Sequence, residues 1–126
     1  MLLADDNRAI LDQLERLLDP TFEIVGAVSD GEGLVKQATA LDPEIIVTDI
    51  SMPGMSGLEA VTRIKQAGLR ARVVFITVFR QPSFMDACFA VGADAFVPKS
   101  VLVCDLVRAL EEVLAGRTFG LDGRRR

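Results

Sequence analysis

Four short apolar segments of this 126-residue sequence end in residues suited to metal or phosphate chemistry. These residues offer three carboxylates, one hydroxyl and one ammonium group: Asp5, Asp6, Asp49, Thr77 and Lys99. If the segments are parallel strands of one sheet, their carboxyl ends meet at one edge, where the three carboxylates repel one another. A hard divalent cation relieves such repulsion, and Mg²⁺ prefers carboxylate oxygens together with water and phosphate oxygens.

A carboxylate that stays free beside the metal can act as a nucleophile toward phosphorus and form an aspartyl phosphate. Mg²⁺ and the lysine would neutralise charge on the moving phosphoryl group, and the hydroxyl would hold one of its oxygens. Taken singly, each residue also has an ordinary structural explanation, such as a helix cap, a turn or a solvated surface position. Because all of them stand at segment ends, we favour the shared site.

The sequence between these residues alternates in character, which predicts the elements that position them. Runs rich in apolar and β-branched residues predict strands at Met1–Ala4, Phe22–Val28, Glu44–Asp49, Arg72–Val78 and Ala95–Val97. Apolar residues at helical spacing predict helices at Arg8–Leu18, Gly31–Leu41, Leu58–Ala67, Pro82–Val91 and Val101–Ala115. Strands that alternate with helices predict a doubly wound α/β fold, in which helices cover both faces of a parallel sheet. Residues 117–126 show no pattern.

The composition excludes several kinds of site. The chain has no histidine, so it has no imidazole zinc site, no Ser-His-Asp triad and no phosphohistidine of its own. Its two cysteines, Cys88 and Cys104, are too few for a disulfide framework. Both lie in apolar stretches of helical character, so we expect free thiols in or near the core.

The charge and hydropathy bear on partners and location. A net charge of −4 argues against direct binding of nucleic acid. Without Arg124, Arg125 and Arg126 the basic residues fall from 14 to 11, against 18 acidic ones, and we interpret this tail as a linker or solvated end. No apolar run approaches the roughly 18 residues that span a membrane, and Asp5 comes too early for a secretion signal. We therefore expect a cytoplasmic protein without membrane contact.

Four motifs occur in order along the chain: Leu2–Asp6, Asp49–Gly57, Phe75–Thr77 and Gly92–Ser100. In these motifs the sequence resembles the response-regulator receiver domains of bacterial two-component signalling, with their acid-pair strand, phosphoacceptor strand and loop, hydroxyl-bearing strand, and switch strand with its lysine. The resemblance implies a receiver domain at residues 1–116, with residues 117–126 as a tail or linker. It also implies a flavodoxin-like sheet of five strands in the order 2-1-3-4-5. In style the sequence is most similar to receivers of LuxR-type regulators.

The resemblance implies roles for the site residues. Asp49 is the phosphoacceptor, and Thr77 and Lys99 hold the phosphoryl oxygens. The implied ligands of Mg²⁺ are three side chains and one backbone carbonyl: Asp5, Asp6, Asp49 and the carbonyl of Ser51. The implied donor is a phosphohistidine on a sensor histidine kinase or a phosphotransfer protein. A receiver of this kind assists its own phosphorylation and dephosphorylation but is a signalling phosphoacceptor, not an enzyme.

The resemblance also implies a switch. Phe96 is the aromatic residue whose ring turns inward when Thr77 moves toward the phosphoryl group. The surface formed by residues 82–115 then changes shape and signals to a partner protein or an output domain. Homodimer formation stays open.

Several residues depart from the pattern of the family, among them Ser100, Phe96, Val78 and Phe79. Ser100 follows Lys99 where many relatives have proline, so we expect no cis peptide bond there. Phe96 stands where tyrosine is common. Phe79, two residues beyond Thr77, stands at a position that influences dephosphorylation in the family, and its ring cannot orient an attacking water. We therefore predict slow autodephosphorylation.

Other classes of function fit less well. An aspartyl-nucleophile phosphatase would need a second acid where Ser51 stands, and a nucleotide-binding enzyme would need a glycine-rich phosphate loop, which the sequence lacks. A helix-turn-helix does not fit into residues 117–126. Two interpretations stay open, a stand-alone phosphorelay module and the N-terminal receiver of a longer LuxR-type DNA-binding transcription regulator.

Overall fold

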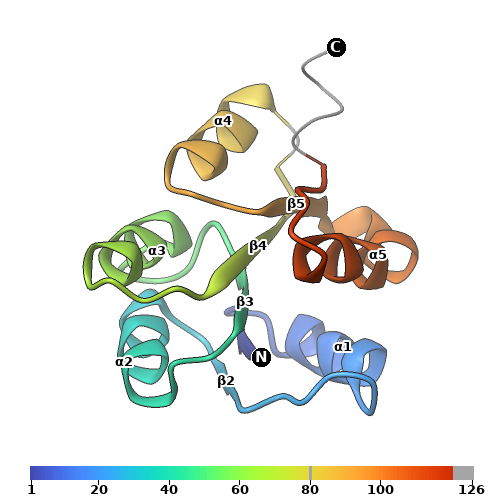
Figure 1. Ribbon diagram of the computed structural model, residues 1–126, viewed down its shortest axis with the longest axis horizontal. Helices are drawn as coiled ribbons and strands as arrows, with labels where there is room; N and C mark the ends of the chain where they lie inside the picture. Colours follow the sequence, from blue (N-terminus) through green and yellow to red (C-terminus); the bar gives the residue numbers. More distant parts are fainter. Residues whose placement is uncertain (80, 121–126) are drawn as a thin grey trace.

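The structure is a computed structural model that describes residues 1–79 and 81–120. In these residues strands alternate with helices along the chain (Figure 1). The strands are β1 (Leu2–Ala4), β2 (Gly26–Val28), β3 (Ile45–Asp49), β4 (Arg72–Thr77) and β5 (Ala95–Pro98). The helices are α1 (Arg8–Leu18), α2 (Gly31–Leu41), α3 (Gly57–Gln66), α4 (Pro82–Ala90) and α5 (Leu102–Leu114), with a short 3₁₀ turn at Lys99–Val101.

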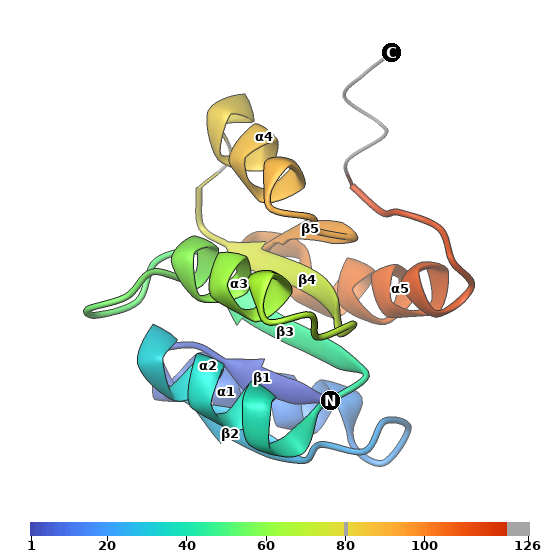
Figure 2. The same cartoon turned by 60° about the vertical axis from the view of Figure 1, so that its left-hand side comes forward.

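The strands form one parallel sheet in the order β2-β1-β3-β4-β5, which confirms the predicted topology. Helices α1 and α5 cover one face, and α2, α3 and α4 cover the other (Figures 1 and 2). Because side chains alternate along a strand, each face carries its own apolar core. β3 is buried along its whole length, as its run of β-branched residues predicts.

Side-chain caps start three helices just beyond strands or loops at the carboxyl edge of the sheet. The side chain of Asn7 accepts hydrogen bonds from the first turn of α1, Asp30 accepts one from Gly33, and Ser56 accepts one from Glu59. These caps satisfy backbone N–H groups in the first turns of the three helices.

Helix α2 also starts in close contact with the loop after β3. A Cβ atom added at Gly31 would lie 2.2 Å from the carbonyl oxygen of Met55. The backbone of the loop thus rests on the first turn of α2, which leaves no room for a side chain there.

The prediction of a strand over Phe22–Val28 is wrong in its extent, since β2 covers only Gly26–Val28. The backbone N–H of Phe22 donates to the carbonyl of Leu18 and so belongs to the turn that ends α1. The length of β2 is set by its neighbour β1, which offers three residues for pairing.

The structure also differs from the prediction after α5. Residues 117–120 lie against the outer edge of β5, and Phe119 forms an isolated parallel bridge with Ala95. A single-residue contact of this kind has no periodicity in the sequence. The arginines at positions 124–126 lie outside the described residues.

The peptide bond between Lys99 and Ser100 is trans, as predicted. Within residues 1–79 and 81–120, no helix is both long and apolar enough to cross a bilayer.

Candidate functional site

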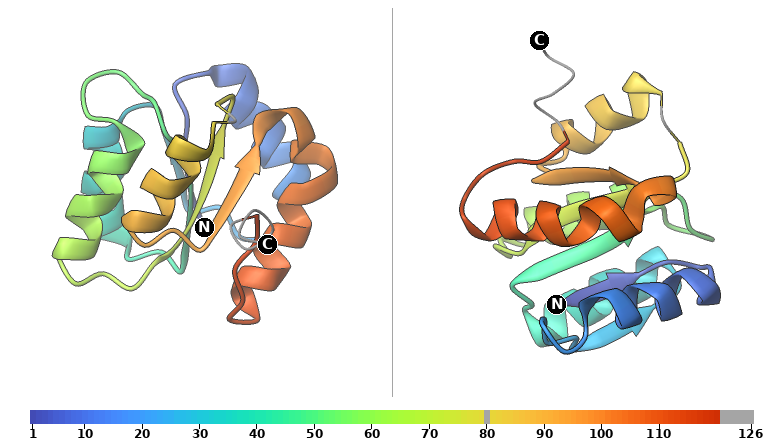
Figure 3. Two further views of the ribbon diagram at one scale, coloured as in Figure 1. Left: turned by 90° about the horizontal axis from the view of Figure 1, so that it is seen from above. Right: turned by 90° about the vertical axis from the view of Figure 1, so that its right-hand side faces the viewer.

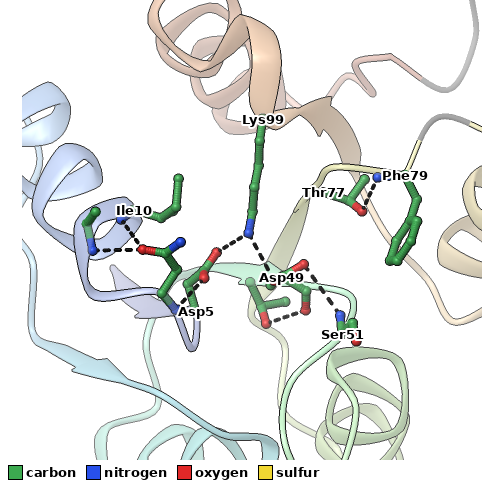
Figure 4. Close-up of polar contacts among 10 residues, drawn as sticks. Asp5, Ile10, Asp49, Ser51, Thr77, Phe79 and Lys99 are labelled. Atoms are coloured by element: carbon green, nitrogen blue, oxygen red, sulfur yellow. Dashed lines mark hydrogen bonds and ion pairs between the residues drawn. The ribbon is translucent and has the colours of Figure 1, made fainter.

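Lys99 joins two acids from different strands at the carboxyl edge of the sheet (Figure 4). Its ammonium nitrogen lies 2.7 Å from Oδ2 of Asp5, which follows β1, and 3.0 Å from Oδ2 of Asp49, which ends β3. The lysine comes directly after β5, so that its side chain reaches across β4 to the middle of the sheet. The structure therefore brings together residues as far as 94 positions apart in the sequence. This is the result expected when the carboxyl ends of parallel strands meet at one edge of the sheet.

Asp49 is held by its own loop. It is 6% exposed, and its Oδ1 accepts a 3.4 Å hydrogen bond from the backbone N–H of Ser51. The hydroxyl of Thr48 donates to the backbone carbonyl of Asp49 at 3.0 Å. A Cβ atom at Gly57 would lie 1.9 Å from that same carbonyl oxygen, so only glycine permits this approach of α3 to the end of β3.

The acid pair after β1 divides into a buried and an exposed residue. Asp5 is fully buried, and its Oδ1 accepts a 2.9 Å hydrogen bond from the backbone N–H of Asn7. Asp6 is exposed. One carboxylate oxygen from each of Asp5, Asp6 and Asp49 lies within 4.8 Å of the other two.

The electrostatics of the site follow from burial and from the lysine. Burial raises the pKa of Asp49 above its ordinary value of 3.8 and outweighs the opposing effect of Lys99. Burial lowers the pKa of Lys99, but the hydrogen bonds and charges of Asp5 and Asp49 outweigh it, so that the pKa lies above 10.5. Lys99 therefore stays charged at neutral pH.

The residues present fit a small divalent cation. Three carboxylates face one ammonium group, which leaves an excess of negative charge. Oδ2 of Asp5 is buried, and apart from its ion pair with Lys99 it accepts no hydrogen bond of normal geometry from the described residues. Clustered carboxylate oxygens of this kind are ligands for hard cations. The acidic cluster is thus consistent with a metal site.

Thr77 and Phe79 form a second part of the site at the end of β4 (Figure 4). The hydroxyl oxygen of Thr77 is buried and accepts a 2.9 Å hydrogen bond from the backbone N–H of Phe79. The ring of Phe79 stacks on Phe84 of α4, with centroids 4.5 Å apart and planes 12° apart. The sequence does not point to Phe84, because no spacing rule links a loop residue to the helix that follows it.

Phe96 lies in the core. It is 2% exposed, and its ring belongs to the apolar cluster beneath α2, α3 and α4. The inward position that the resemblance associates with phosphorylation is thus the one that the structure shows.

Comparison with known proteins identifies one family. The sequence profile of the Response regulator receiver domain matches residues 1–111. The nitrate/nitrite response regulator protein NarL of Escherichia coli (strain K12) is 32% identical over 118 residues, which cover 92% of this chain and 55% of that protein. The transcriptional regulatory protein PdtaR of Mycobacterium tuberculosis (strain ATCC 25618 / H37Rv) is 31% identical over 112 residues, 88% of this chain and 54% of that protein. The chain spans about half the length of these curated relatives.

Solved structures resemble the chain over nearly its whole length. A LuxR-family two-component response regulator from Aurantimonas sp. SI85-9A1 matches with a TM-score of 0.88 at 29% identity, covering 97% of this chain and 89% of that one. The isolated REC domain of RcsB from Salmonella enterica serovar Typhimurium, solved in the presence of phosphomimetic BeF₃⁻, matches with a TM-score of 0.86 at 25% identity, covering 94% of this chain and 89% of that one.

Proposed function

Because the chain belongs to the response regulator receiver domain family, we propose that Asp49 accepts a phosphoryl group from a phosphohistidine on a sensor histidine kinase or phosphotransfer protein. A receiver domain is a phosphoacceptor signalling module of two-component systems rather than an enzyme. The observation that carries the assignment to Asp49 is its contact with Lys99 inside the acidic cluster. Of the three clustered acids, Asp49 alone ends the central strand and lies between Asp5 and the end of β4.

The transfer exchanges one bond to phosphorus for another. A carboxylate oxygen of Asp49 attacks phosphorus, the P–N bond to the donor imidazole breaks, and the electron pair leaves with that ring. The Lys99 ammonium, 3.0 Å from Asp49, neutralises charge on the phosphoryl oxygens. We propose that the ligands of Mg²⁺ are Asp5, Asp6, Asp49 and the backbone carbonyl of Ser51. The ion, when bound, supplies further charge neutralisation for the transferred group.

Thr77 would couple the phosphoryl group on Asp49 to β5 at the neighbouring edge of the sheet. Its hydroxyl oxygen accepts from Phe79, which leaves the hydroxyl hydrogen free to bond a phosphoryl oxygen. Movement of Thr77 toward Asp49 would leave room for the ring of Phe96 on the next strand to stay in its buried position, and burial of that ring favours this state. The surface of residues 82–115 then changes shape and meets a partner.

Labelling with acetyl phosphate tests the proposal. Incubation with acetyl phosphate and Mg²⁺ is expected to add one phosphoryl group to the intact protein, measured by mass spectrometry. Asp49→Asn should abolish the gain. Asp42→Asn is the matched control, because Asp42 is exposed, lies at the opposite edge of the sheet and has a left-handed backbone that asparagine tolerates. Labelling that persists in Asp49→Asn, or that is absent from the wild type, contradicts the proposal.

A second proposal concerns the whole protein. The match covers 55% and 54% of the lengths of the two relatives, which favours the N-terminal receiver of a longer LuxR-type DNA-binding regulator over a stand-alone relay module. In this proposal residues 1–116 are the receiver and residues 117–126 are the tail or linker to an output domain. The histidine kinase partner and a cytoplasmic location belong to the same proposal. Sequencing the reading frame beyond residue 126 distinguishes the two forms.

A further inference from the structure

Residues 117–120, here called the strap, run beside the outer edge of β5 (Figure 3). The backbone N–H of Phe119 donates to the carbonyl of Asp94 at 3.1 Å, and the backbone N–H of Phe96 donates to the carbonyl of Phe119 at 3.0 Å. β5 is the last strand of the sheet, so its outer edge would otherwise expose these groups. The strap is therefore paired directly with the residue that the proposed switch uses.

Two side chains fix the strap to α5. The guanidinium group of Arg117 forms an ion pair with Glu112 at 2.6 Å. The guanidinium of Arg108 lies over the ring of Phe119, 5.7 Å from its centroid. The Phe119 ring packs at the margin of the core beneath α1 and α5, on the opposite face of the sheet from the Phe96 ring.

The strap approaches Phe96 as closely as backbone allows. Gly120 has a φ of +81°, and a Cβ atom added there would lie 2.2 Å from the carbonyl oxygen of Phe96. The strap thus touches Phe96 at both its N–H and its carbonyl, and glycine is required at position 120 for this contact.

The position of the strap bears on where the Phe96 ring can go. β4 lies on the inner side of Phe96, so a ring that leaves the core must move toward the outer edge of β5. The space on that side is a cavity of about 260 Å³ beside α4 and α5, and Phe119 and Gly120 form part of its wall. The strap narrows the space that an outward ring would enter.

We propose that the strap is a positioning element that holds Phe96 in its inward position and thereby favours phosphorylation of Asp49. The proposal rests on the proposed function, in which the inward ring and the phosphoryl group stabilise each other. If docking of the strap favours the inward ring, linkage then requires that docking of the strap and binding of a phosphoryl group or its mimic favour each other by the same factor.

The test compares two glycines of equal backbone strain in the full chain. Gly120→Ala places a methyl group against Phe96, whereas Gly68→Ala has a φ of +85° and no atom within 4 Å of the added Cβ. The probe is BeF₃⁻ with Mg²⁺, measured by calorimetry, together with the rate of labelling by acetyl phosphate. We expect Gly120→Ala to bind BeF₃⁻ roughly fivefold or more weakly than the wild type and Gly68→Ala to match the wild type. Phe119→Pro, which removes the N–H that donates to Asp94, should act as Gly120→Ala does.

A double variant separates positioning from general stability. With the ring removed in Phe96→Ala, the addition of Gly120→Ala should have no further effect on BeF₃⁻ affinity, whereas a general loss of stability would persist. Phe96→Leu serves the same purpose if the alanine variant does not fold. If the wild type is labelled at Asp49 but Gly120→Ala binds BeF₃⁻ as tightly as the wild type or more tightly, the strap proposal alone is overturned. A wild type that neither binds BeF₃⁻ nor is labelled at Asp49 overturns the proposed function as well.

Discussion

Lys99 is the residue on which the charge balance of the site depends. It pairs with Asp5 and Asp49, two acids that would otherwise face each other with one of them fully buried. Asp5 and Asp49 also raise the pKa of Lys99 against the effect of its own burial, so the two acids keep the lysine charged. A charged group at this position is required before any phosphoryl group arrives, because the acids need a counterion at all times.

The residue at position 79 offers a test of phosphoryl lifetime. Phe79 presents an apolar ring stacked on Phe84 and no group that can orient water for attack on the aspartyl phosphate. We expect Phe79→Glu, whose carboxylate can hold a water, to shorten the lifetime of the phosphorylated protein by roughly tenfold or more. The lifetime is measured by intact mass after removal of acetyl phosphate.

The control for this experiment is Phe79→Leu, which loses the stack with Phe84 but gains no acceptor for water. If Phe79→Leu and Phe79→Glu shorten the lifetime equally, the cause is loss of the stacking contact between Phe79 and Phe84. An unchanged or longer lifetime in the glutamate variant would refute the role proposed for Phe79.

At the scale of the elements, the start of α3 is fixed by the contact of Gly57 with Asp49. A Cβ at Gly57 would meet backbone at 1.9 Å, which cannot be relieved by turning a side chain. Gly57→Ala is therefore expected to lower the free energy of unfolding by about 3 kcal/mol or more. Gly54→Ala, in the same loop with a φ of +71° and no atom within 4 Å, should cost only about 1 kcal/mol. Urea unfolding followed by circular dichroism measures both, and similar losses in the two variants would contradict the close contact.

The elements also show where sequence reasoning succeeds and why. The predicted bounds of Arg8–Leu18 and Gly31–Leu41 are confirmed, because a capping side chain and an apolar stripe are local properties of the sequence. The extent of β2 was not predictable in this way, since pairing with β1 and not local composition sets the start of the strand at Gly26. Likewise, the grouping of Asp5, Asp49 and Lys99 follows from parallel strand order alone, whereas the Phe79–Phe84 stack depends on how a loop folds back on a helix.

At the scale of the whole molecule, the reactivities of the two cysteine thiols give a measure of how often the fold opens. Burial raises the pKa of the Cys88 thiol to about 12, and its side chain is fully buried in the core beneath α4. Because the thiolate is the reactive form, Cys88 stays protonated and inert far below that pH and becomes reactive only when the fold opens. Cys104 is exposed on α5.

We expect one thiol to react at once with a thiol reagent at pH 8 and the second to react only in denaturant, at a rate that follows unfolding. Cys104→Ser should remove the fast reaction, and Cys88→Ala the slow one. Two fast thiols in the wild type would show that α4 does not cover the core as described.

The contact between Gly31 and the carbonyl of Met55 limits how pieces of this protein can be recombined. The loop after β3 and the beginning of α2 come from separate stretches of sequence, yet neither can be exchanged without regard to the other. Consider a chimera in which the loop after β3 comes from one relative and α2 from another. The two segments will fit together only if the relative that supplies α2 also has glycine at the position of Gly31. Grafts should therefore transfer both stretches as one unit.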